Sequence, residues 1–277
     1  MSAAYEKRIL RVLDYIHENP AGDLSLDQLA DVAAMSRFHW HRVFRAITGE
    51  TCAQAVRRIR LHRAASALVM TDRSVESIAA SVGYPNAGSF SRAFTESYDH
   101  SPAAFRKEGR HLPSRPNFRT GEYPMYPVTV RDEPARRLVG LPHRGAYYEI
   151  GKCFEAFGAL CEVRSLWPQM GPVAAIYYDN PDDVPEAELR SFAGGVFCDE
   201  GVPEGMEEQQ LSGGKTAVLT YKGPYSGISA AYHSLFGNWL PQSGEEPAEA
   251  PCYEIYLNNP REVAPEELLT EICLPLK

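Results

Sequence analysis

The chain has 277 residues, 44% of them apolar, and a net charge of −8. This length and composition allow two domains with proper cores. No apolar run approaches the roughly 20 residues that span a bilayer, and the charged start at Tyr5–Arg8 is no secretory signal. We therefore expect a cytoplasmic protein that does not enter a membrane.

The six cysteines include no Cys-x-x-Cys pair, which argues against zinc and redox motifs. In the cytoplasm they are expected to be reduced and mostly buried. His39 and His41 are two residues apart, a spacing that directs side chains apart on a helix. We expect neither a metal nor a cofactor.

Charge divides the chain into unlike halves. Residues 1–110 contain 15 Lys/Arg and 12 Asp/Glu, whereas residues 111–277 contain 13 and 24. The stretch from Arg37 to Arg63 holds seven arginines and one acid, Glu50. This asymmetry indicates a first half that faces nucleic acid and an acidic second half with a different partner.

Helical signals follow one another through the first half. Apolar spacing predicts a helix over 9–16, Ser25–Gln28 is a capping box for a second helix, and Ser36 caps a third. Residues 52–69 are expected to form one long helix, and Ser74 caps another helix that ends at Gly83. Asn86 then caps a helix that carries Phe90 and Phe94.

The same pattern occurs twice. Ser25-Leu26-x-x-Leu29-Ala30 corresponds to Ser74-Val75-x-x-Ile78-Ala79 at an offset of 49, and Trp40-x-Arg42-x-Phe44 corresponds to Phe90-x-Arg92-x-Phe94 at an offset of 50. Two short helices joined by a glycine-containing turn form a helix-turn-helix unit. The chain is therefore predicted to have two such units, separated by a helix of about 27 Å, close to one turn of DNA.

The motif from Ile78-Ala79 through Gly83-Tyr84, Ser89-Phe90 and Ser101-Pro102 to Phe105-Arg106 resembles the C-terminal signature of AraC/XylS transcription regulators. The resemblance implies double-stranded promoter or operator DNA as a partner. With Trp40, Val43 and Phe44 packed inward in the first unit, and Phe90 and Phe94 in the second, the side chains left for DNA are Arg37, Phe38, His41, Arg42, Arg45, Asn86, Ser89, Ser91 and Arg92.

Two departures from that family pattern affect the second unit. Tyr98-Asp99-His100 stands where relatives usually carry a glycine before the Ser-Pro element. Ala87 and Gly88 offer few hydrogen-bonding groups where many relatives have polar side chains. We expect this unit to hold phosphate and recognise DNA shape more than it reads bases.

A Pro-rich, polar stretch at 111–123 is predicted to link a DNA-binding domain at 1–110 to a second domain at 124–277. Short β-type runs are expected in the latter near 125–131, 136–143, 173–178, 194–198, 215–221, 253–257 and 269–274, with helices near 148–163 and 226–240. Ile176–Leu189 repeats as Ile255–Leu268 at an offset of 79, with seven of fourteen positions identical. The fold class is therefore an all-α first domain followed by an α+β domain made of a duplicated strand–helix–strand–strand unit.

Arg144-Gly-x-Tyr147, Trp239-Leu-Pro241, the Pro251–Pro260 segment and the ending at Leu274-Pro-Leu276 resemble the gyrase-inhibitor-like effector-binding domain. The combined organisation is similar to that of Rob-type regulators. The resemblance implies an aromatic pocket with a carboxylate that receives lipophilic, often cationic molecules. Glu254 replaces the alanine of its repeat counterpart and introduces one ionisable group. We expect it to bind the ligand with walls from Tyr147, Tyr177, Tyr225, Trp239 and Tyr256.

The expected function is thus sequence-specific transcription regulation controlled by a small lipophilic or cationic effector, with RNA polymerase as a further partner and no enzymatic activity. Two alternatives remain. The second domain acts as a hydrolase, with Glu254 and Tyr147 or Tyr225 as general base and acid. Otherwise, the regulator is constitutive and its pocket has lost its ligand.

Overall fold

The computed structural model describes residues 3–109, 124–260 and 262–277, so the predicted linker at 111–123 lies outside the described residues. Two compact units are present. The helical unit contains residues 3–35 and 47–109. The sheet unit contains residues 36–46 together with the described residues from 124 onward. The segment 36–46, which was predicted to belong to the DNA-binding domain, therefore groups with the sheet unit.

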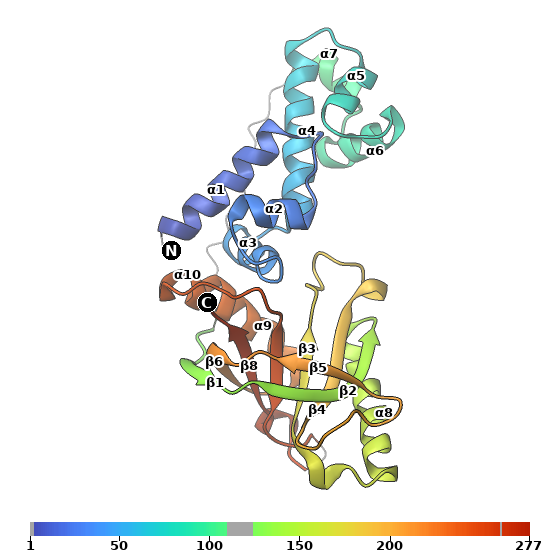
Figure 1. Cartoon of the computed structure of the whole chain (residues 1–277). Coiled ribbons are helices and arrows are strands. Elements are labelled where there is room, and N and C mark those ends of the chain that lie inside the picture. The colour runs from blue at the N-terminus through green and yellow to red at the C-terminus, as the bar shows by residue number, and fades with distance from the viewer. Residues whose placement is uncertain (1–2, 110–123, 261) are drawn as a thin grey trace. The chain divides into compact units, whose positions relative to one another are not determined.

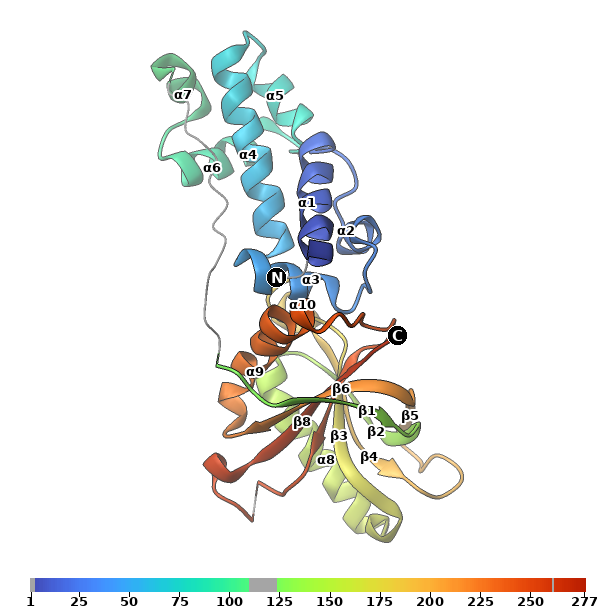
Figure 2. The same ribbon diagram turned by 90° about the vertical axis from the view of Figure 1, so that its left-hand side faces the viewer.

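Four helices of the first half begin directly after their predicted capping residues, whereas α3 (Trp40–Thr48) begins four residues after Ser36, its predicted cap (Figures 1 and 2). Side chains of Ser25, Ser74, Asn86 and Ser101 each accept a hydrogen bond from the backbone three residues later. Such caps satisfy backbone N–H groups that the first turn leaves unpaired. The helical unit contains α1 (Ala3–Glu18), α2 (Leu26–Ala33), α4 (Cys52–Met70), α5 (Val75–Ser81), α6 (Ala87–Tyr98) and α7 (Pro102–Glu108).

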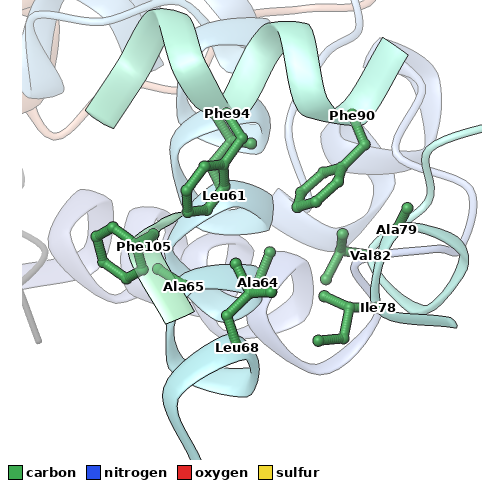
Figure 3. Close-up of a cluster of buried hydrophobic side chains, with 10 residues drawn as sticks. All are labelled: Leu61, Ala64, Ala65, Leu68, Ile78, Ala79, Val82, Phe90, Phe94 and Phe105. Carbon is green, nitrogen blue, oxygen red and sulfur yellow. The ribbon is translucent and has the colours of Figure 1, made fainter. Parts of the chain in front are cut away.

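Aromatic side chains hold the second helix-turn-helix unit together (Figure 3). Phe90 and Phe94 of α6 and Phe105 of α7 pack on the apolar side of α4, around Leu61 and Leu68. The Phe94 and Phe105 rings meet edge to face, with centroids 5.3 Å apart. The predicted inward orientation of Phe90 and Phe94 is confirmed, so their helix has one fixed orientation on α4.

Two residues with positive φ shape the turns around α6. Gly83 has φ +79°, and a Cβ there would lie 2.7 Å from both the Arg60 Nη2 and the Pro20 carbonyl oxygen. Asp99 has φ 58° and ends α6 in the left-handed conformation that glycine usually supplies. The turn is therefore left-handed even without a glycine, and Asp99 adopts this conformation at a cost in stability.

A single eight-stranded antiparallel sheet forms the sheet unit, in the order β1-β6-β8-β7-β3-β4-β2-β5. Its strands are β1 (Val128–Glu133), β2 (Arg136–Arg144), β3 (Met170–Tyr177), β4 (Arg190–Phe197), β5 (Glu207–Leu211), β6 (Gly214–Lys222), β7 (Cys252–Tyr256) and β8 (Leu269–Pro275). The order is symmetric about the β7–β3 pair, as the duplication predicts.

The edge strands are exchanged between the two repeats. β1 precedes the first repeat but pairs with β6 of the second, and β5 precedes the second repeat but pairs with β2 of the first. β5 is absent from the sequence-based prediction because its sequence, EEQQL, has no alternating apolar residues. Its position is determined by pairing rather than by its own pattern.

Helices pack on the sheet in matching places. α8 (Ile150–Val163) contacts β2 and β4, and α9 (Ile228–Ser234) contacts β6. A π-helical turn at Leu235–Trp239 and α10 (Leu240–Ser243) continue the second helix. α3 (Trp40–Thr48) begins in this unit, and Trp40, Val43 and Phe44 are buried as predicted. Within the described part of the chain, no helix is both long and apolar enough to cross a membrane.

Candidate functional site

Glu254 is a buried carboxylate in the middle of the sheet. It lies on β7 with only 3% of its surface exposed, opposite Ala175 of β3. Alternation along β7 places its side chain on the same face as Tyr256. The small Ala175 leaves room above the sheet that a larger cross-strand partner would fill.

Three tyrosines form a hydrogen-bonded group with this carboxylate. The Tyr232 hydroxyl of α9 donates to Oε1 of Glu254 and the Tyr256 hydroxyl donates to Oε2, each at 2.9 Å. The hydroxyl oxygens of Tyr177 and Tyr256 are 3.0 Å apart. Both carboxylate oxygens therefore have neutral donors, and within the described residues Glu254 has no ion-pair partner.

Burial raises the pKa of Glu254 to about 7, against the lowering effect of the Tyr256 and Tyr232 hydrogen bonds and of the Arg42 charge. The pKa values of Tyr177, Tyr232 and Tyr256 are raised well above their ordinary value, also chiefly by burial. The carboxylate thus changes charge near neutral pH, while the phenols around it stay protonated.

A cavity of about 1450 Å³ opens above this group. It is larger than the roughly 300–1,000 Å³ of pockets that hold drug-sized ligands, so an organic molecule has room in it. Of the residues predicted to contact a ligand, five line it: Glu254, Tyr147, Tyr177, Tyr225 and Tyr256. Tyr147 donates to the Asp179 carbonyl and stacks edge-on against Tyr177. Tyr225 stacks in the same way against Tyr256.

Trp239, the sixth predicted wall residue, is half-buried and does not line the cavity. It lies at the end of the π-helical turn, whose wider spacing changes the direction of the side chains that follow it. Phe236, in the same turn, lines the cavity instead.

Sequence reasoning also missed wall residues on both helices. They are Phe154, Phe157, Tyr232 and Phe236, and Trp167 between the helices in sequence lines the cavity as well. The repeat does align Phe154 with Tyr232, so a signal for that pair was present. The helical pattern alone does not distinguish an aromatic residue that lines a cavity from one that packs in the core.

The predicted DNA-contacting residues at the start of α3 lie in different environments. Arg37 is exposed and Phe38 is half-buried, whereas His41 is buried, and burial together with Arg42 lowers its pKa to about 3. Arg42 and Arg45 both line the cavity.

The predicted residues of α6 lie in the helical unit. Asn86 and Ser89 are hydrogen-bonded to each other as the N-cap, Ser91 is half-buried and Arg92 is exposed. Arg92 and Ser89 line a hollow of about 640 Å³ together with Arg57, Arg60 and Tyr84. Two of these arginines have partners within the helical unit: Arg57 pairs with Glu96, which also lines the hollow, and Arg60 Nε donates to the Pro20 carbonyl oxygen at 2.6 Å.

Other chemistry is sparse in the part of the chain that the structure describes. No group of three His, Cys, Asp or Glu residues there is arranged to hold a metal ion. All six cysteines are free, and five are buried. Burial raises the pKa of the Cys252 thiol to about 12, so it is not an activated nucleophile.

Comparison with known families identifies both regions of the chain. Residues 126–277 match the GyrI-like small molecule binding domain, and residues 29–108 match a helix-turn-helix domain. The chain therefore belongs to the AraC-type helix-turn-helix regulators that carry a GyrI-like domain.

Individual relatives agree. The chain is 34% identical to transcriptional regulator Rob of Salmonella typhimurium over 79% of each chain. It is 34% identical to the right origin-binding protein of Escherichia coli K12 over 43% of this chain and 42% of that one. The chain spans less than half the length of several curated relatives, among them AdaA of Bacillus subtilis (34% identity, 35% of this chain, 46% of that protein).

A solved structure of EcmrR bound to DNA in EcmrR-RPo is similar over 55% of this chain and 58% of that one, with 19% identity and a TM-score of 0.47.

Proposed function

We propose that this chain regulates transcription by binding promoter DNA through its helix-turn-helix units, in contact with RNA polymerase, and that its GyrI-like domain binds a lipophilic organic cation. The observation that carries the effector part is Glu254, a buried carboxylate with two phenol donors and no counter-ion within the described residues. A buried charge is unfavourable unless it is paired.

A cation that enters the cavity supplies that pairing. It also meets the faces and edges of Tyr147, Tyr225 and Tyr256, and each favourable cation–π contact contributes roughly 0.5–2 kcal/mol. Phe154, Phe157 and Trp167 also line the cavity and fit an apolar body attached to the cation. The expected ligand therefore has a charged head and an aromatic or aliphatic remainder.

For the DNA part, the hollow beside α6 contributes a cluster of Arg57, Arg60 and Arg92, while α6 itself offers few base-reading groups. This supports phosphate and shape recognition by the second helix-turn-helix unit.

Calorimetric titration of the full chain with lipophilic cations tests the effector proposal. The wild type should bind at least one cation more tightly than its neutral isostere, and Glu254→Gln should weaken that cation while leaving DNA affinity intact. Equal titration curves for wild type and Glu254→Gln would contradict the role of the carboxylate.

A hydrolytic role has one favourable observation: a pKa near 7 is suited to a general base. The same titrations distinguish it, because chromatography of the recovered ligand shows turnover or its absence. Recovery of intact ligand supports reversible sensing.

A further inference from the structure

Three side chains in and just before α3 contact the rest of the sheet unit. Arg42 and Arg45 are three positions apart on α3, so their side chains share a face of the helix, and His39 immediately precedes α3. Arg42 Nη2 donates to the Asp179 carbonyl oxygen at 3.0 Å, and Arg45 forms a 2.8 Å ion pair with Asp182. His39 Nε2 lies 2.8 Å from the Ala250 carbonyl oxygen.

The Arg42 guanidinium is held on aromatic rings of the cavity wall. Its central carbon lies 4.8 Å from the centroid of Tyr232 and 5.6 Å from that of Phe236. The His39 ring stacks on Phe236, with centroids 5.6 Å apart. A cation within about 6 Å of a ring centroid, over the ring face, is attracted by the ring quadrupole, so both rings stabilise this guanidinium.

The charges that line the cavity divide by origin. Among the described residues, its lining contains two arginines, Arg42 and Arg45, and no lysine, and both arginines come from α3. The acidic lining residues come from elsewhere in the sheet unit: Glu155, Glu162, Asp182, Glu254 and Glu262. Without the α3 side chains, the charged lining residues that the structure describes are acidic and include no arginine or lysine.

Tyr232 connects the α3 contact to the carboxylate. Its hydroxyl donates to Glu254 while its ring face carries Arg42. Arg42 is close enough to lower the pKa of Glu254 but does not pair with it. A second cation seated on Glu254 would therefore share the Tyr232 ring with Arg42 and be repelled by it, strongly so where water is excluded.

We propose that the Arg42 side chain occupies part of the effector cavity. The effector is a flat guanidinium- or amidinium-like organic cation, and its binding releases α3 for DNA. The inference rests on the proposed effector function and adds the ligand class and the coupling. Arg42 and Arg45 contact the cavity and are also expected to contact DNA, and one side chain cannot do both. The cation and DNA therefore favour the same released state, as linkage requires for positive coupling.

Charge reversal at the α3 contact tests the coupling without altering a residue expected to contact DNA. In the full chain, Asp182→Arg repels Arg45, whereas Glu186→Arg makes the same charge change at an exposed position four residues away that is not part of the cavity lining. On a duplex selected from a random pool by the wild type, Asp182→Arg should bind about tenfold more tightly than Glu186→Arg.

The ligand class is tested with biphenylguanidine and its neutral isostere biphenylurea. The guanidine, not the urea, should raise the DNA affinity of the wild type, and saturating DNA should raise the affinity for the guanidine by the same factor. The inference is wrong, while the effector function stands, if biphenylguanidine binds but DNA does not change the affinity for it, and if Asp182→Arg and Glu186→Arg bind DNA equally. If no lipophilic cation binds any variant, the effector function itself fails, and the assigned ligand class with it.

Discussion

Glu254 lies directly opposite Ala175 in the β3–β7 pair, and Ala175 is also its counterpart in the internal repeat. The pseudo-twofold axis of the sheet unit therefore passes between these two residues. A duplicated fold with identical residues there would carry either two carboxylates in contact or none. The substitution of one member creates a single ionisable group at the centre of the sheet, which favours one ligand per chain.

The affinity for a cation should depend on pH through this carboxylate. Because the pKa of Glu254 is about 7, the fraction ionised rises about tenfold between pH 6 and pH 8. Binding of biphenylguanidine, followed by calorimetry, should strengthen by a similar factor over that range. Glu254→Gln should abolish the dependence, and Glu155→Gln, another acid of the lining, should retain it. A pH dependence that persists in Glu254→Gln would assign it to a group other than this carboxylate.

Stability should change with pH in the opposite sense. A carboxyl whose pKa is raised on folding releases its proton more readily in the unfolded chain, so stability is lost as pH rises from about 4.5 to about 7. The shift corresponds to roughly 3 kcal/mol. Thermal unfolding followed by circular dichroism should therefore show Glu254→Gln more stable than wild type at pH 8 and similar to it near pH 4.5. Greater wild-type stability at pH 8 would contradict the raised pKa.

Arg92→Ala should weaken DNA binding by a similar factor on every sequence. Loss of one phosphate contact lowers the slope of log affinity against log salt by about 1. Fluorescence anisotropy on a set of half-site variants measures both quantities, and Lys107→Ala, an exposed basic residue of α7, is the matched control. The prediction is wrong if Arg92→Ala abolishes preference among half-sites while non-specific affinity stays the same.

Asp99→Gly should stabilise the helical unit by roughly 1 kcal/mol, because glycine adopts the left-handed conformation without the cost that a Cβ imposes. Denaturant unfolding measures this gain. Gly83→Ala provides the opposite case: its Cβ would collide with Arg60 and Pro20, and a clear loss of stability is expected. Lower stability of Asp99→Gly would mean that contacts of the aspartate outweigh its backbone conformation.

Local signals predicted the helical unit well. Ser25, Ser74, Asn86 and Ser101 each determine a helix start through one side-chain hydrogen bond, which depends only on residues three positions away. The repeat likewise predicted the duplicated sheet, because equal sequences favour equal structures. Strand alternation and repeat comparison indicated Glu254, Tyr177 and Tyr256, whereas the aromatic walls as a class were expected from the resemblance to the effector-binding domain.

The features that the sequence did not predict depend on distant parts of the chain. β5 is a strand because β2 pairs with it. Trp239 ends a π-helical turn and is not among the described residues that line the cavity. The contact of Arg42 with Tyr232 joins residues 190 positions apart, and no local pattern distinguishes an arginine that meets DNA from one that meets an aromatic ring.

The exchanged edge strands make the two repeats interdependent. The edge strand of each repeat comes from the other repeat. β1, at the start of the first repeat, pairs with β6 of the second, and β5, at the start of the second repeat, pairs with β2 of the first. Neither copy has a complete sheet of its own, so a half-domain cut between them is not expected to fold alone. Changes in the sheet beneath the cavity therefore affect both repeats at once. We expect adaptation to different ligands to occur in the helices that cover the sheet.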